Sequence, residues 1–200
     1  AVGDVYYDES GTAEGIVCWI ADTVFSDSGK YYGLYGKMIS LDQSGKQQDG
    51  YYGLMYARSD GPTYAFDSVD GRINTALHMA LRSDTSHYMF KERIQAAKWC
   101  TDKGEGWYFP AKCEMYDVFQ HIDLFNEVLT EIGGELFYTE FYCEETNIYW
   151  TSTEIERPND VYQFAIAYHF VVESEIHEQY SPHYNRHHVR AMKWFNEAEN

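Results

Sequence analysis

The chain has 200 residues, of which 44% are hydrophobic and 18% aromatic, and its formal net charge at pH 7 is −17. Because a chain of this length buries roughly 70% of the surface that its unfolded form exposes, we expect residues 1–200 to form a single domain. The acidic charge argues against nucleic acids and anionic membranes as partners, since both are bound through basic patches. No stretch reaches the ~20 consecutive apolar residues of a membrane span, so we expect no direct insertion into a bilayer.

Strand signals occupy the beginning of the chain. Residues 5–7 and 15–20 are rich in β-branched and aromatic side chains, and the turn-prone residues 8–11 between them predict a hairpin. Residues 37–41 predict a third strand. Residues 51–58 have the aromatic content of an edge strand, but a glycine among them leaves their assignment open.

Helical periodicity follows these strands. Asp70 precedes a pattern that predicts a helix to about residue 82, capped by Asp70 and buried through Ile73, Leu77, Ala80 and Leu81. The same spacing predicts a second helix to about residue 100, with Phe90, Ile94 and Ala97 on its buried face.

Residues 104–115 join a strand, a turn and a helix. The aromatic run 107–109 predicts a buried central strand that ends at Pro110, because proline cannot donate to a continuing ladder. Glu114 lies in the first turn of the next helix, where a negative charge suits the exposed N–H groups. The predicted buried face of that helix consists of Met115, Val118, Phe119 and Ile122. A further helix is predicted to bury Phe125, Leu129 and Ile132 and to stop at Gly133 and Gly134.

The last third of the chain returns to strands. Residues 148–153 have strand composition, residues 162–170 alternate between large and small side chains, and residues 189–195 predict a final strand. Strands, then helices, then strands indicate an α+β domain. We expect the N- and C-terminal strands to meet in one antiparallel sheet, with the helices from the middle of the chain packed on it.

Several local patterns, in this order, resemble one family. They are residues 3–7 with 15–17, the helix start at 70–75, residues 106–111 with Glu114 and Met115, residues 149–154, and Val189 and Arg190 with Phe195. Together they resemble the C-type-lectin-like domains found at the C-termini of bacterial collagen-like adhesins and in many surface proteins of gut Bacteroidales.

The resemblance implies a C-type-lectin-like fold related to that of formylglycine-generating enzymes, and an extracellular or cell-surface location. It implies no reaction, because such folds carry unrelated functions. The glycine that often turns the hairpin after the strand at 162–170 is absent here. Residues 171–178 take its place, and we expect them to form a loop of different length or shape.

The resemblance in fold raises one enzymatic alternative, a formylglycine-generating type of enzyme that acts through a reactive cysteine pair. The cysteines of the chain bear on it. Cys18, Cys100, Cys113 and Cys143 form an even set whose pairing the sequence leaves open, with buried free thiols at least as well supported as disulfides. None lies in the terminal region that a formylglycine-generating enzyme would require, and no basic residue flanks Cys143 to lower its pKa. A Ser-His-Asp arrangement stays open, because triads are set by geometry rather than by order. We therefore expect no enzymatic activity and no cofactor.

Metal binding is a second alternative, raised by five histidines that fall close together: His169, His177, His183, His187 and His188. The proline at 182 favours a loop there, so a solvated or binding surface explains the histidines better than a metal site does. Residues 157–160 weakly resemble the loop through which calcium-dependent lectins hold a sugar, but residues 151–153 offer only hydroxyls to complete such a cage.

The function that these observations favour is ligand binding or adhesion outside the cell, with a protein or a glycan as partner. Aromatic and polar side chains combine rigid contact area with adaptable hydrogen bonding. The predicted ligand-binding residues are Tyr162, His169, Tyr180, His183, Tyr184, Asn185 and His187. A receptor-binding protein of the same fold, diversified by mutagenic retrotranscription of its C-terminal codons, is the alternative within this class.

Overall fold

A computed structural model of the chain describes residues 1–21, 35–44, 54–55, 63–83, 94–138, 148–155, 164–171, 175–182 and 186–196. Within them the helices are α1 (Gly71–Ser83), α2 (Gln95–Thr101), α3 (Lys112–Gln120) and α4 (Ile122–Ile132). The strands in the same residues are β1 (Val5–Tyr7), β2 (Ala13–Ile20), β3 (Tyr35–Ser40), β4 (Leu54–Met55), β5 (Trp107–Tyr108), β6 (Ile148–Ile155), β7 (Phe164–Val171), β8 (Glu175–Pro182), β9 (Arg186–His187) and β10 (Met192–Asn196). The mixed α+β class is confirmed.

The first sheet joins the two ends of the chain, as predicted. Its described strands run in the order β1-β2-β3-β10-β5, and the neighbouring strands are antiparallel. β1 and β2 form the predicted hairpin, with Val5 opposite Ile16, and β10 pairs with β3. The prediction that Trp107 lies on a central strand is wrong, because β5 is the last of the described strands in this sheet and pairs with β10 at its edge.

A second antiparallel sheet holds β6, β7 and β8, and β4 pairs with β9. The expectation of a single sheet is therefore wrong for these strands. So is the expectation of a loop at 171–178, because β7 continues to Val171 and β8 begins at Glu175, where the two strands pair. β8 is an edge strand with exposed charged side chains at positions such as Glu178, which explains why it lacks a strong hydrophobic alternation.

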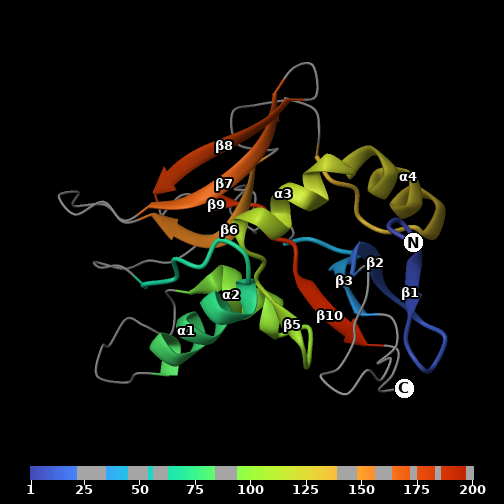
Figure 1. Cartoon of the computed structure of the whole chain (residues 1–200), viewed down its shortest axis with the longest axis horizontal. Coiled ribbons are helices and arrows are strands. Elements are labelled where there is room, and N and C mark those ends of the chain that lie inside the picture. The colour runs from blue at the N-terminus through green and yellow to red at the C-terminus, as the bar shows by residue number, and fades with distance from the viewer. Residues whose placement is uncertain are drawn as a thin grey trace.

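Helix α3 lies between the two sheets, near the centre of the molecule (Figure 1). Its predicted face is confirmed, since Met115, Val118 and Phe119 are almost fully buried. They share a hydrophobic core with Ile16 of the first sheet and Ile166 of the second. α4 follows and ends at Gly133, whose φ of 72° gives the predicted left-handed C-cap. In the described residues, no helix is long and apolar enough to cross a bilayer.

A second core, on the other face of the first sheet, contains Trp107, Val17 and Phe195, with Ala97 and Cys100 of α2. Trp107 is 8% exposed, so its predicted burial is confirmed, but it packs away from the α3 core. Tyr108, the next residue, points into the α3 core instead. Successive residues of a strand face opposite sides, which is why the pair serves both cores.

The predicted buried face of α1 is wrong. Ile73 is 51% and Leu77 39% exposed, whereas three polar side chains are buried: Asn74, Thr75 and His78. The three buried side chains lie against other buried polar groups, with which they form hydrogen bonds. The Thr75 hydroxyl accepts from the Phe109 N–H at 3.0 Å, and the Asn74 amide donates to the Asp67 carbonyl at 2.7 Å. Asp70 caps the helix as predicted, accepting from the Arg72 N–H at 2.9 Å.

Candidate functional site

The structure separates the predicted ligand-binding residues. Tyr162 and residues 183–185, which include His183, Tyr184 and Asn185, lie outside the described residues. His169 lies on β7, and only its backbone is described. Tyr180 lies on β8 and is 50% exposed, so it remains a candidate for contact with a ligand. His187 is only 2% exposed, so in this conformation it cannot contact a ligand from outside.

The placement of His187 and His188 on a solvated surface is therefore wrong. Both are 2% exposed. The segment that carries them is held against β6, because the Trp150 N–H donates to the His188 carbonyl at 2.9 Å and the His188 N–H donates to the Ile148 carbonyl at 2.8 Å. The ring of His187 packs 4.4 Å from that of Trp150, centroid to centroid. Both histidines are parts of the core.

Ser181 and His187 form a side-chain pair near the predicted site with the spacing of a nucleophile and its base. In the described residues the Ser181 Oγ lies 2.6 Å from the His187 Nε2. Ser181 is fully buried, however, so a substrate cannot approach its hydroxyl in this conformation. The pair is better explained as mutual satisfaction of two buried polar groups.

A loop beside Tyr180's sheet presents further aromatic side chains. One end of the second sheet is formed by the last residues of β6, the first residues of β7 and the last residues of β8. There Ala165 lies between Glu154 on β6 and Ser181 on β8. The loop at 63–70 is attached to the β6 edge there, because the Glu154 N–H donates to the Ala65 carbonyl at 2.8 Å. Tyr64 is 65% and Phe66 39% exposed, and their rings meet edge to face at 6.1 Å. We call Tyr64, Phe66 and Tyr180 the aromatic end.

Tyr64 has a backbone φ of 63°, the only positive value at a non-glycine position in the described residues. This conformation is unfavourable for a residue with a Cβ. It is held by the buried carboxylate of Glu154, whose two oxygens accept from the Thr63 N–H at 3.0 and 2.9 Å. Burial raises the pKa of Glu154, and these backbone hydrogen bonds oppose the rise.

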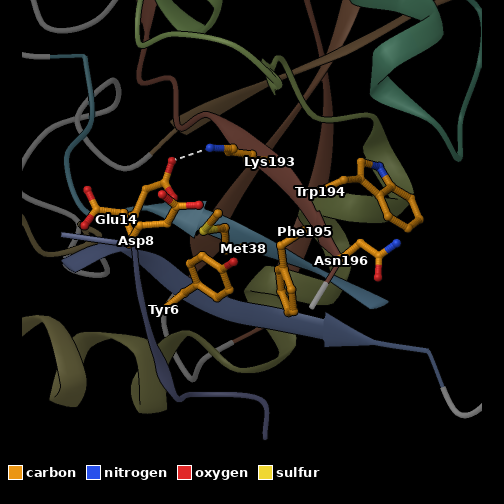
Figure 2. Close-up of a pocket in the computed structure, with 9 residues that line it drawn as sticks. Tyr6, Asp8, Glu14, Met38, Lys193, Trp194, Phe195 and Asn196 are labelled. Carbon is orange, nitrogen blue, oxygen red and sulfur yellow. Dashed lines mark hydrogen bonds and ion pairs between the residues drawn. The ribbon is translucent and has the colours of Figure 1, made fainter. Parts of the chain in front are cut away.

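A separate pocket opens on the first sheet, whereas the described residues of the predicted site lie on β7, β8 and β9. It encloses about 330 Å³ and is lined by residues of β1, β2, β3 and β10 and of the turn after β1. Figure 2 shows Tyr6 and Phe195 side by side in its wall, with Met38 behind them. The two rings lie 4.7 Å apart. Phe195 can lie against β3 because its neighbour there is Gly36, where a Cβ would stand 2.5 Å from the ring.

Charged groups line the opposite side of the pocket. Asp8, Glu9 and Glu14 contribute three carboxylates, and Lys193 contributes one ammonium group, which forms an ion pair with Glu14 (Figure 2). The pocket could not be predicted from local sequence patterns, because its residues come from the two ends of the chain. The sequence carries one signal of it, the adjacent acidic residues Asp8 and Glu9 in the predicted turn at 8–11.

Cys18 and Cys100 are buried free thiols, and Cys113 is an exposed free thiol, while Cys143 lies outside the described residues. Burial raises the pKa of the Cys18 and Cys100 thiols, which disfavours the reactive thiolate. Where side chains are described, no group of three or more His, Cys, Asp or Glu residues is arranged to hold a metal ion.

Comparison with known proteins gives a likeness of fold. No family model and no curated protein sequence matches the chain. A solved structure, of a fimbrial protein from Bacteroides ovatus, superposes with a TM-score of 0.58 at 15% sequence identity. The match covers 98% of this chain and 49% of the fimbrial protein, so the chain spans about half the length of that protein. The chain thus shares its fold with part of a bacterial fimbrial protein.

Proposed function

We propose that this chain is a non-enzymatic ligand-binding or adhesion domain that acts at the cell surface and binds a protein or a glycan through the aromatic end. We further propose that its fold is of the C-type-lectin-like kind that the sequence patterns resemble. The observation that carries the proposal is the exposed Tyr64, which is held in an unfavourable backbone conformation by the buried Glu154.

Backbone strain supports a binding role for this loop. Holding a non-glycine residue at positive φ costs of order 1–3 kcal/mol, and such positions cluster at ligand-binding sites because the surrounding structure must enforce them. Here the enforcing group is a buried carboxylate, which is itself costly to bury. Two unfavourable features are therefore retained together, and their joint effect is to present the Tyr64 and Phe66 rings to solvent.

The chemistry of the aromatic end fits recognition. Large, rigid aromatic side chains with a polar tip supply contact area at little cost in conformational entropy, and Tyr is enriched at binding hot spots. Tyr64 and Tyr180 are 65% and 50% exposed, at the two edges of the same end of the sheet. A ligand that contacts both would lie across the ends of β6, β7 and β8.

Two further observations favour binding over catalysis and a surface location over an internal one. The Ser181 hydroxyl is closed to substrate, and the thiols of Cys18 and Cys100 are buried, so these nucleophiles are poorly placed to react. The structural neighbour is a fimbrial protein. From its description as fimbrial we infer a surface location for this chain, as part of the proposal, together with the location that the lectin-like resemblance implies.

The test is binding of the fluorescently labelled protein to arrays of glycans and of extracellular proteins. We expect at least one ligand, whose signal falls at least fivefold in Tyr64→Ala and in Tyr180→Ala. Tyr7→Ala is the matched control, because Tyr7 is 55% exposed but lies on β1 of the first sheet. Absence of any ligand, or equal loss in all three variants, would contradict the proposal.

A further inference from the structure

We propose that the pocket on the first sheet is a second binding site, and that it takes a protonated primary amine on an aliphatic stem, such as a lysine side chain of a partner protein. The site is independent of the aromatic end, so either proposal can fail without the other. The argument rests on the shape, the wall and the charge of the pocket, taken in turn.

The size of the pocket suits a side chain rather than a large ligand. Its volume of about 330 Å³ is at the lower limit of the range of about 300–1,000 Å³ that is typical of small-molecule sites. Gly15 and Gly36 lie next to it on β2 and β3, and each allows close packing there, since a Cβ at either position would collide with a neighbour. At Gly15 the nearest atoms would be the Ile39 carbonyl oxygen at 2.8 Å and the Met38 Sδ at 2.9 Å.

The wall offers apolar contact to an aliphatic stem. The Tyr6 and Phe195 rings are tilted by 34° to one another, and Met38 lies behind them (Figure 2). Met38 is fully buried and Phe195 is 6% exposed, so both are fixed by packing, and the aromatic surface that a ligand meets is mainly that of the partly exposed Tyr6. Each methylene group that a ligand buries against such a wall tightens binding about fourfold.

The charges favour a cation. Three carboxylates, those of Asp8, Glu9 and Glu14, face the single ammonium group of Lys193, so the lining carries a net charge of −2 (three negative charges and one positive). The net charge of −17 on the whole chain strengthens the attraction of cations to this site and opposes anions.

The carboxylate of Asp8 is fixed in position by hydrogen bonds within its own turn. Its Oδ1 accepts from the Ser10 hydroxyl at 2.6 Å, from the Thr12 N–H at 2.9 Å and from the Ser10 N–H at 2.9 Å. These bonds, that of the Ser10 hydroxyl foremost, hold the pKa of Asp8 below its usual range and keep it ionised. Because all three bonds use Oδ1, Oδ2 is the oxygen that a ligand would meet.

Lys193 shows that an ammonium group fits this environment. Its Nζ is paired with Glu14 and lies 5.9 Å from the centroid of the Trp107 ring, within the range of a cation–π contact. The protein's own Lys193 is therefore already paired with one of the three carboxylates, and its aliphatic stem lies along the sheet. Asp8 and Glu9 are left to a second cation, which no described residue supplies in the pocket.

The experiment is an NMR titration of the whole chain with Nα-acetyl-lysine N-methylamide. Its Nε-acetylated form is the neutral control, and cadaverine tests whether a free diamine binds equally well. We expect the signals of Tyr6, Gly15 and Phe195 to shift with the lysine derivative and not with the neutral form. If cadaverine binds more tightly than the lysine derivative, a free polyamine replaces the protein side chain as the ligand, and the partner named here is wrong.

Variants separate a local site from the general attraction of an acidic protein. Glu9→Gln should weaken binding about two- to fivefold, as for one solvent-exposed ion pair, and Lys193→Met should tighten it because a competing cation is removed. Glu131→Gln on α4 makes the same change in net charge outside the pocket and should leave the affinity unchanged. Equal weakening by Glu9→Gln and Glu131→Gln, or equal binding of the neutral control, would overturn the proposal.

Discussion

The carboxylate of Glu114 accepts a hydrogen bond from the Gly71 N–H at 3.0 Å, which joins the starts of helices α1 and α3. The same carboxylate accepts from the Ala111 N–H at 2.8 Å, so it satisfies an otherwise unpaired donor at the start of each helix. The Tyr108 hydroxyl and the Lys37 ammonium group donate to its other oxygen at 2.8 and 2.7 Å. Gly71 permits this contact, because a Cβ there would stand 2.3 Å from the Phe109 carbonyl oxygen.

This network predicts that Glu114→Ala is strongly destabilising. The substitution leaves the largely buried Lys37 ammonium group without its counter-ion, and it removes the acceptor of the backbone N–H groups at two helix starts. We therefore expect a loss of about 3–5 kcal/mol in the free energy of unfolding. Urea denaturation measures it. Glu131→Ala, on the exposed side of α4, should cost about 0.5 kcal/mol or less. Similar losses in the two variants would mean that the network contributes little.

Substitutions at Trp107 and Tyr180 test which of the two residues belongs to the core and which to the binding surface. Trp107 is 8% exposed and lies in a core, so Trp107→Ala should cost about 3–5 kcal/mol. Tyr180 is 50% exposed, and Tyr180→Ala should cost about 0.5 kcal/mol or less. The same small effect is expected of Tyr184→Ala, which lies outside the described residues. Thermal unfolding of these variants is the measurement. A larger loss of stability in either tyrosine variant than in Trp107→Ala would show that the core and the surface have been misassigned.

The strain at Tyr64 has a measurable consequence. Because glycine adopts positive φ without steric cost, Tyr64→Gly should leave the free energy of unfolding unchanged or raise it by up to about 1 kcal/mol. Phe66→Gly, in the same loop, should lower it by about 1 kcal/mol, since no strain is relieved there. If both variants lost stability equally, Tyr64 would not be strained in solution.

Glu154 should make stability depend on pH in an unusual direction. Its pKa is raised in the folded state, chiefly by burial, so the folded protein binds this proton more tightly than the unfolded chain does. The contribution of Glu154 to stability is therefore largest at low pH and falls as the pH rises from the carboxyl pKa of the unfolded chain through that of the folded protein. Glu154→Gln removes this titration but keeps an oxygen for the Thr63 N–H.

The free energies of unfolding of the wild type and of Glu154→Gln, measured in urea from about pH 4 to pH 8, provide the check. The wild type should lose stability relative to the variant as the pH increases. A difference that grows in favour of the wild type at higher pH would contradict the burial of this carboxylate.

Thiol reactivity tests the enzymatic alternative. In a Cys143→Ser background, a disulfide reagent at neutral pH should modify Cys113, which is exposed, at the rate of an ordinary free thiol. Cys18 and Cys100 should react only on unfolding, since burial raises their thiol pKa values. Rapid stoichiometric labelling of Cys113, or of Cys143 in the wild type, would indicate an activated nucleophile and favour the enzyme instead.

Local patterns predicted the elements better than they predicted what those elements contact. The apolar spacing of Met115, Val118 and Phe119 identified a buried face correctly, because α3 packs between two hydrophobic sheet faces. The same reasoning failed for α1. There the neighbouring groups are polar, and the inward side is the one on which Asn74 donates to the Asp67 carbonyl and Thr75 accepts from the Phe109 N–H.

The candidate sites depend on long-range contacts that sequence spacing does not reveal. The polar and aromatic residues around His187 predict a binding loop, yet the backbone of the next residue, His188, is hydrogen-bonded to β6 and the ring of His187 packs on Trp150. Tyr64 showed no signal, since its strain comes from Glu154, which lies much later in the chain. The pocket lined by Asp8 and Lys193 exists only because β10 enters the first sheet beside β3.

The most direct test of the proposed function is to map a bound ligand on the protein by NMR. With the tightest ligand from the arrays, we predict that chemical-shift changes concentrate at Tyr64, Phe66 and Tyr180, and that the Tyr6 and Phe195 signals of the separate pocket stay unchanged unless the ligand carries an exposed amine. Changes confined to the first sheet or to α4, with none at Tyr64 or Tyr180, would contradict the claim that this domain binds its ligand through the aromatic end.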